Sequence, residues 1–323
     1  MATYQRKDYQ SLLDASVALT TFTEQPPSAN TAIASGQRPH QDYQTTGPGL
    51  EYFFLGNGYI QVAVQHSTVP SSGTALGLLV MHPDHFARKS STFLYHPESG
   101  LERSMVTVIA NEKVYYATPA SLEVHWEYPG AIPTVVATWR ASRCLVREEL
   151  WCPVGVPVLA RTVRVKNNGS NPIEVQTQVM LYPNQMLFDE QICLEEEQIL
   201  EAHGYLTLRV SVLEKGRAND RWLTIAAGPL SKGEESSSTF LYSLGGSRKK
   251  FSRKDLEQLR GKTSAYWRTT SEFQANDMLD HLFRTSKNGL RAAVSSTGKM
   301  DSGIWQYNQE WIRDESMIVI ALV

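Results

Sequence analysis

The spacing of apolar residues changes once along this chain, near residue 250, and that change constrains the fold more than any other feature. Before it, from Glu51 to Leu244, short runs rich in β-branched and aromatic residues alternate with turn residues. Many strands without intervening helices indicate antiparallel sheets, because parallel strands need long crossover connections. The pattern therefore predicts a mainly β fold, a large antiparallel β-sandwich within residues 1–250.

Individual strands can be located in this region. Residues 51–65 read EYFFLGNGYIQVAVQ, which is two strand-like runs around the tight-turn signal Gly56-Asn57-Gly58. Residues 163–181 alternate between apolar and polar on either side of Asn167–Pro172, and this predicts a second hairpin with one buried face. Further strand-like runs lie at 134–139, 206–212, 222–226 and 239–244.

After residue 250 the apolar residues recur at intervals of three and four, as they do on one face of a helix. Ser252 and Asp255 have the spacing of a capping box, which predicts a linker helix in residues 251–270. A second amphipathic helix of about 20 residues is expected around Leu279–Ala293, with Leu282, Phe283 and Leu290 on its apolar face.

A third helix is expected to begin at Trp311, with acidic residues in its first turn, where the helix dipole favours them. Its second half, Ile318–Val323, is apolar on nearly every face, which is typical of a helix buried on all sides. A chain that ended there in the folded protein would expose a large apolar surface. We therefore expect a fragment, in which residues 271–323 are the truncated start of a helical domain.

Charge and composition exclude several classes of partner. Lysine and arginine number 31 against 33 acidic residues, so no global field favours nucleic acid or an anionic membrane. The longest apolar run, Met317–Val323, is far shorter than the roughly 20 residues that span a bilayer, and Met1–Leu13 lacks the apolar core of a secretory signal. The odd set Cys144, Cys152 and Cys193 fits a reducing compartment. We expect a cytoplasmic protein without nucleic-acid or membrane partners.

The most informative segment is GIWQYNQEWIRDES, residues 303–316. A pyranose ring has an apolar face that packs on aromatic rings such as Tyr307 and Trp311, and hydroxyls that charged groups bind strongly. Arg313 and Asp314 suit those hydroxyls, because the Asp314 carboxylate accepts hydrogen bonds from them. The Arg313 guanidinium donates hydrogen bonds to them and offsets the buried negative charge of Asp314. The same four residues also suit an ordinary helix start, with an Arg–Asp cap and core aromatics. The spacing alone leaves both readings open.

This segment resembles the start of the catalytic domain of glycoside hydrolase family 15, the glucoamylases and their relatives. In that family a Tyr-x-x-x-Trp-x-Arg-Asp motif leads into an inner barrel helix, and Tyr307, Trp311, Arg313 and Asp314 match it. Phe283–Met300 resembles the helix and loop that precede the motif. In prokaryotic members a β-sandwich precedes an (α/α)6 barrel, which is the order of elements expected here.

The resemblance implies a six-hairpin glycosidase that releases glucose from α-glucosidic chain ends, with an oligosaccharide or glucoside as substrate and no cofactor. It implies that Arg313 and Asp314 bind hydroxyls of the terminal glucose, while Tyr307 and Trp311 line the same subsite. The catalytic glutamates of the family lie in later barrel loops, so we expect no catalytic residue in this chain and no activity from it alone. Asn308-Gln309-Glu310 departs from the interior of the family motif.

Two alternatives remain open from the sequence. A disaccharide phosphorylase of similar architecture tends to carry Trp-Asp-x-Glu where this chain has Trp311-Ile312-Arg313-Asp314. The second alternative is a non-catalytic carbohydrate-binding or scaffold sandwich. No metal site is expected at His82-Pro83-Asp84-His85, because the proline suggests a turn and no further ligand has an obvious spacing.

Overall fold

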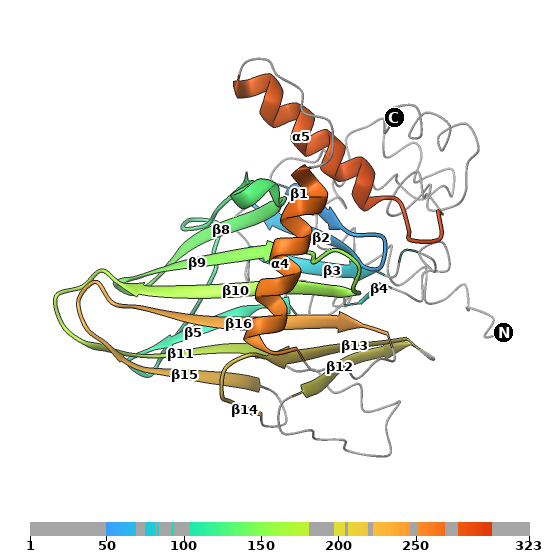
Figure 1. Ribbon diagram of the computed structural model, residues 1–323. Coiled ribbons are helices and arrows are strands. Elements are labelled where there is room, and N and C mark those ends of the chain that lie inside the picture. The colour runs from blue at the N-terminus through green and yellow to red at the C-terminus, as the bar shows by residue number, and fades with distance from the viewer. Residues whose placement is uncertain are drawn as a thin grey trace, which may run out of the picture.

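The computed structural model describes residues 50–68, 75–81, 83, 92–93, 104–180, 197–203, 206–218, 222–245, 251–268 and 277–298. Antiparallel strands in three sheets make up most of the described chain before residue 246 (Figure 1). Two α-helices follow in the described part, α4 (Arg253–Arg268) and α5 (Asp277–Ala292). The predicted fold class, mainly β with C-terminal helices, is confirmed.

The largest sheet forms one layer of a sandwich. Its seven strands have the order β12-β13-β16-β10-β9-β8-β7. Their bounds are β7 Glu123–Glu127, β8 Thr134–Ala141, β9 Cys144–Trp151, β10 Val158–Asn167, β12 Glu197–His203, β13 Leu206–Val212 and β16 Glu235–Leu244.

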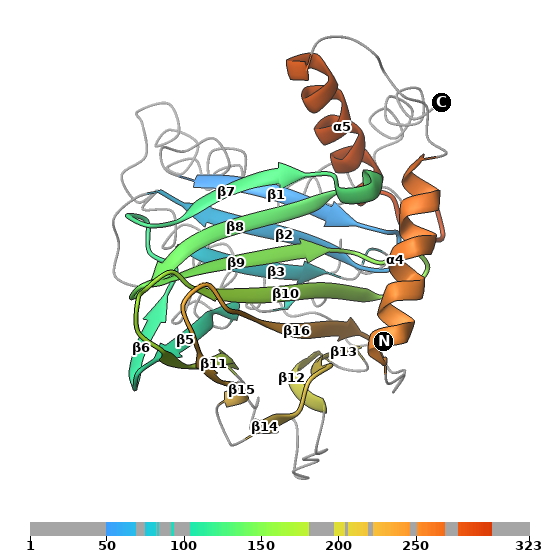
Figure 2. The ribbon, with the colours of Figure 1, turned by 60° about the vertical axis from the view of Figure 1, so that its left-hand side comes forward.

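Two smaller sheets lie behind it and form the other layer (Figure 2). The four-stranded sheet has the order β1-β2-β3-β4, and the five-stranded sheet has the order β14-β15-β11-β5-β6. Their bounds are β1 Leu50–Gly56, β2 Gln61–Ser67, β3 Leu76–Met81, β4 Thr92–Phe93, β5 Val106–Ala110, β6 Lys113–Tyr116, β11 Ile173–Met180, β14 Gly216–Ala218 and β15 Trp222–Leu230.

One hydrophobic cluster fills the space between the layers. Val64 of β2, Val108 of β5 and Val146 of β9 come from the three different sheets, and each belongs to this cluster with 0% of its surface exposed. Successive side chains of a strand point to opposite faces, and alternate residues of β9 and β10 accordingly reach this core. The sandwich therefore has a single continuous interior.

The two hairpins predicted from sequence have different outcomes. The turn at Gly56-Asn57-Gly58 is confirmed, because β1 and β2 pair in antiparallel register across it. The hairpin predicted around Asn167–Pro172 is wrong: β10 pairs with β9 and β16, whereas β11 pairs with β15 and β5 in the other layer. Alternation shows which face of a strand is buried, and it does not specify the partner strand.

Helix α4 lies across one end of the outer face of the seven-stranded sheet (Figure 2). Its predicted capping box is confirmed, because Ser252 N donates to Asp255 Oδ2 over 2.8 Å and Asp255 N donates to Ser252 Oγ over 3.2 Å. Leu256 packs on a second apolar cluster that includes Trp151 and Leu241. The helix thereby covers the part of this face that is apolar.

Helix α5 is attached to the edge of the sandwich at β1. Asn288 Nδ2 donates to the carbonyl of Phe54 over 2.7 Å. Gly56 faces Ala292 so closely that a Cβ atom there would lie 2.7 Å from Ala292 Cα. A side chain at position 56 would therefore push the end of α5 away.

The apolar stripe of α5 faces away from the sandwich. The helix spans 16 residues, and its contacts with β1 include the polar Asn288 and the small Ala292. By contrast, large apolar side chains of its first half are exposed: Met278 74%, Leu279 45%, Leu282 53% and Phe283 37%. The predicted amphipathic helix is confirmed, but its apolar side is not the side that contacts the sandwich.

Candidate functional site

The four residues predicted to bind sugar, Tyr307, Trp311, Arg313 and Asp314, lie outside the described residues. The helix predicted from Trp311 onwards also lies outside them. Their roles therefore stay predictions. The described segments that precede them most closely in sequence are α5 and the turn that ends at Gly298.

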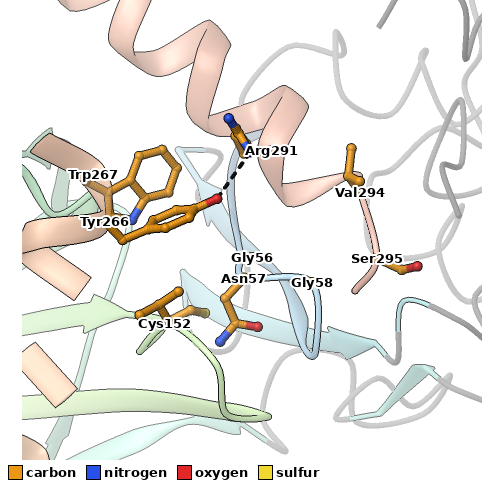
Figure 3. A pocket seen from close by; sticks show the side chains of 10 residues that line it. Gly56, Asn57, Gly58, Cys152, Tyr266, Trp267, Arg291, Val294 and Ser295 are labelled. Atoms are coloured by element: carbon orange, nitrogen blue, oxygen red, sulfur yellow. Dashed lines mark hydrogen bonds between the residues drawn. The ribbon is translucent and has the colours of Figure 1, made fainter. Parts of the chain in front are cut away.

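A cleft opens where the sandwich meets the ends of the two helices (Figure 3). We call it the junction cleft, and its volume is about 120 Å³. The turn between β1 and β2, the segment after β9, the last turn of α4 and the end of α5 each contribute to its wall. The lining residues are Gly56, Asn57, Gly58, Cys152, Val154, Tyr266, Trp267, Arg291, Val294 and Ser295.

Asn57 holds the floor of the junction cleft together. Its Nδ2 donates to the carbonyls of Pro153 and Val156, the latter over 2.7 Å. Its Oδ1 accepts from the backbone N–H groups of Tyr59 and Ile60 over 2.9 and 3.1 Å. Since both ends of the amide have partners inside the protein, Asn57 is a structural residue of this cleft.

The end of α5 is tied to the same turn. Ser296 N donates to the carbonyl of Gly58 over 2.7 Å. Gly58 has a φ of +85°, and a Cβ atom there would lie 3.0 Å from Ser296 N. A glycine at this position therefore allows both the left-handed backbone and the close approach of the chain after α5.

The groups in the wall with binding capacity are two aromatic rings and a guanidinium. The rings of Tyr266 and Trp267 meet edge to face, with centroids 5.5 Å apart. The guanidinium carbon of Arg291 lies 5.9 Å from the centroid of the Tyr266 ring, and its Nη1 donates to Tyr266 Oη over 3.2 Å (Figure 3). These groups can bind an aromatic-stacking or hydrogen-bond-accepting ligand.

The thiol in the cleft is not a nucleophile. Burial strongly raises the pKa of Cys152, so the thiol stays protonated and unreactive near neutral pH. Burial also raises the pKa of Cys144. The described lining residues include no carboxylate. Glycoside hydrolysis needs a pair of acidic side chains, so this wall offers binding groups and no acid–base pair for that reaction.

Of the residues that line this cleft, the sequence singles out only Gly56-Asn57-Gly58, as a tight turn and not as a binding site. Adjacent helical residues point about 100° apart, so Tyr266 and Trp267 cannot both enter one narrow apolar stripe. Tyr266 is 37% exposed. This difference in direction is the sequence signal for an exposed aromatic ring at the end of α4.

Among the residues that the structure describes, no group of three or more His, Cys, Asp or Glu side chains could hold a metal ion. His82 and His85 lie outside that part of the chain. Among the helices that the structure describes, none has the length and apolar character needed to cross a membrane.

The sequence matches no family model and no curated protein. Among solved structures, the fold is similar to a bacterial glucoamylase complexed with acarbose, with a TM-score of 0.44, 12% identity and coverage of 83% of this chain and 48% of the glucoamylase. A protein from the human microbiome whose assigned activity is kojibiose phosphorylase aligns with a TM-score of 0.36, 10% identity and coverage of 75% and 38%.

The heparan sulfate lyase HepC from Pedobacter heparinus aligns with a TM-score of 0.40, 9% identity and coverage of 76% of this chain and 43% of the lyase. The chain therefore spans less than half the length of each of these three structures. The neighbours include carbohydrate-active enzymes of different activities, and they do not assign the chain to one family.

Proposed function

We propose that this chain is the amino-terminal part of a glycoside hydrolase that releases glucose from α-glucosidic chain ends. The observation that carries the proposal is the motif formed by Tyr307, Trp311, Arg313 and Asp314. It follows a β-sandwich and a helix, as it does in the family that the sequence resembles. The proposal includes the division into a sandwich at 1–250, a linker helix at 251–270 and the start of a barrel at 271–323.

The orientation of α5 supports a further helical layer. A helix with exposed Met278, Leu282 and Phe283 leaves apolar surface in water, which is unfavourable. The face toward the sandwich is occupied by polar contacts, such as that of Asn288 with β1. Neighbouring barrel helices would cover the outward stripe and remove it from water.

In this proposal the motif holds the terminal glucose. Trp311 and Tyr307 pack on the apolar face of the ring, while Arg313 and Asp314 bind its hydroxyls through charge-assisted hydrogen bonds. The proton transfers require two carboxyl groups on either side of the scissile bond. We assign these to residues that follow position 323. The 323-residue chain by itself should then release no glucose from maltooligosaccharides.

The activity test uses the product of the complete reading frame, incubated with maltotriose in the presence and absence of inorganic phosphate. Glucose release that is independent of phosphate is the expected result. Formation of glucose 1-phosphate only when phosphate is present would replace the proposal with the phosphorylase alternative. A reading frame that stops after residue 323, with no turnover of any glucoside, would favour the scaffold alternative.

The site test uses variants of that same protein. Asp314→Asn and Trp311→Ala should each lower kcat/KM for maltotriose by about 10- to 100-fold, because each removes a direct contact to the sugar. Glu257→Gln, at an exposed position on α4, is the control and should leave kcat/KM unchanged. Equal activity of Asp314→Asn and the control would contradict the assigned binding role.

A further inference from the structure

Helix α5 presents its apolar stripe to solvent, on a different side from Asn288, which contacts β1. The exposed members of the stripe are Met278, Leu279, Leu282 and Phe283. The stripe continues toward the end of the helix with Leu290, which is half-buried. Large apolar side chains in water are unfavourable, so this side of α5 suits a partner with an apolar face of its own.

The second half of α5 adds a charge requirement to this partner. Lys287 and Arg291 lie one turn apart, and the pKa of Lys287 is lowered by burial and by the positive charge of Arg291. Lys287 also lies beside the stripe, because its Nζ is 5.8 Å from the centroid of the Phe283 ring. A carboxylate near Lys287 would offset the repulsion between the two cations. The partner should therefore combine apolar side chains with an acidic one.

The segment 311–323 of the same chain has these properties. Its sequence is WIRDESMIVIALV, and each residue of a helix is rotated by about 100° from the one before it. In a helix over this segment, one side about 80° wide carries Ile312, Glu315, Val319 and Val323. Three of these residues are apolar, and Glu315 supplies the acidic side chain.

The length of the segment matches the stripe. Its 13 residues would form a helix about 20 Å long, and the 16 residues of α5 span about 24 Å. Twelve residues separate Gly298, the last described residue after α5, from Trp311. A connection of that length can span up to about 40 Å, which is enough for the chain to return along α5. Consecutive helices commonly pack side by side and antiparallel.

One antiparallel register satisfies both requirements. The facing pairs are Ile312 with Leu290, Glu315 with Lys287, Val319 with Phe283, and Val323 with Leu279. A shift of the segment by four residues in one direction would set Glu315 against Phe283. The same shift in the other direction would set Val319 against Lys287. The antiparallel arrangement also places the start of one helix beside the end of the other, which the helix dipoles favour.

We propose that segment 311–323 packs as a helix on the apolar stripe of α5, antiparallel to it, with Glu315 beside Lys287. Packing in this orientation turns Arg313 and Asp314 away from α5, because each points more than about 100° from Val319. They then face the interior of the helical domain, where the sugar binds in the proposed function. This consequence rests on the proposed function, whereas the packing itself does not.

The packing is tested by disulfide trapping in the 323-residue chain that carries Phe283→Cys and Val319→Cys together. Cys193→Ser is included, whereas Cys144 and Cys152 are buried and can remain. A disulfide needs Cα atoms within about 7 Å of each other, which facing positions of two packed helices provide. Mild oxidation should link positions 283 and 319 within one chain, as identified by mass spectrometry of the linked peptides.

The matched control combines Phe283→Cys with Met317→Cys, since Met317 points about 160° away from Val319 on the same helix. This pair should link at least about tenfold more slowly, because its Cα atoms lie too far apart. Equal rates for the two pairs would overturn the proposal. A disulfide that joins position 283 of two chains would also overturn it, because a second copy would then occupy the stripe.

Charge reversal tests the register without changing the apolar side chains. Glu315→Lys places a second cation beside Lys287 and should speed amide exchange in α5 by about two- to fivefold. Adding Lys287→Glu should restore the original rates. Glu257→Lys, at an exposed position on α4, is the control and should leave exchange in α5 unchanged. Exchange that stays fast in the double variant would contradict the pair of Glu315 and Lys287.

Neither experiment measures turnover, so the packing and the hydrolase activity are tested separately. A chain that fails both experiments while the complete product releases glucose would overturn the packing alone. A chain that passes them while the complete product releases no glucose would overturn the hydrolase alone.

Discussion

Arg161 lies buried in the sandwich core, whereas Arg291 lies half-buried at the junction of the sandwich with the helices. Arg161 is 1% exposed, its Nε donates to Glu148 Oε2 over 2.7 Å, and its Nη1 donates to the carbonyl of Ser104 over 2.6 Å. Arg291 has one donor bond to Tyr266 and a buried Nε without an acceptor. Arg161 therefore has acceptors in the core for its buried donors, whereas Arg291 keeps a buried donor without an acceptor at the end of a helix whose first half exposes large apolar side chains.

The core network connects the two layers of the sandwich. Glu148 accepts from Trp139 Nε1 over 2.7 Å as well as from Arg161. Ser104, whose carbonyl accepts from Arg161, also accepts at its Oγ from Leu78 N over 2.8 Å. Burial would lower the pKa of Arg161, but the charge of Glu148 outweighs it and the pKa is raised. Arg161 therefore stays charged in the core.

The largest effect is expected from Glu148→Gln, which leaves the Arg161 charge buried without its counterion. Breaking a buried pair in this way costs about 3–5 kcal/mol of unfolding free energy, measured by urea denaturation. The control is Glu235→Gln, because Glu235 and Arg164 form an exposed pair with side chains 41% and 38% exposed, and its loss should cost less than about 1 kcal/mol. Equal costs would remove the distinction between the core and the surface pairs.

At the junction, Gly56→Ala tests the close contact with α5. The new Cβ would lie 2.7 Å from Ala292 Cα and 2.9 Å from its carbonyl oxygen, and backbone atoms cannot easily move aside. We expect a loss of about 1–3 kcal/mol in the attachment of α5, seen as faster amide exchange in α5 with the sandwich unchanged. Gly261→Ala is the control, since no atom lies within 4 Å of that site on α4.

Gly261→Ala should stabilise α4 by up to about 1 kcal/mol, because alanine is the better helix former. If Gly56→Ala leaves exchange in α5 as slow as in the unsubstituted protein, the described contact is wrong.

A smaller effect is expected from Tyr128→Phe. Tyr128 Oη and Thr285 Oγ1 are 3.0 Å apart, and this bond joins the sandwich to the middle of α5. Its removal should cost about 0.5–1.5 kcal/mol, and only amides of α5 should exchange faster. Faster exchange throughout β7 and β8 would indicate that Tyr128 instead supports the sandwich.

The smallest effect concerns pH. The hydrogen bond from Arg147 lowers the pKa of Glu127 below its ordinary value, with a further contribution from His125. A carboxyl with a lower pKa in the folded state stabilises the fold above its unfolded pKa, and that contribution is lost as pH falls through the folded pKa. As the pH falls below about 5, the free energy of unfolding of Glu127→Gln should therefore decrease less than that of the unsubstituted protein. The difference between the two decreases should be under about 1 kcal/mol. Parallel pH profiles of the two proteins would contradict this.

Local features of the fold could be predicted from the sequence. The turn at Gly56-Asn57-Gly58 and the cap formed by Ser252 and Asp255 depend on residues a few positions apart, and both are confirmed. The partner of β11 could not be predicted, because pairing with β5 and β15 joins segments far apart in the chain. Alternation along Ile173–Met180 is the same for either partner.

The junction cleft could not be predicted for the same reason. It joins Asn57, Cys152, Trp267 and Arg291, which come from four separate segments. The apolar stripe of α5 was visible in the sequence, but its periodicity does not show which neighbour it faces. The contact of Asn288 with Phe54 and the exposure of Met278 and Leu282 define that direction.

The most direct test of the account is whether the apolar stripe of α5 is covered in the product of the complete reading frame. Met278→Cys and Leu282→Cys would be labelled with a thiol reagent, with Glu257→Cys on the exposed face of α4 as the reference. If a further helical layer packs on α5, the two stripe positions should react at least about tenfold more slowly than position 257. Equal labelling rates at all three positions would show a solvent-facing stripe and would contradict the proposed barrel.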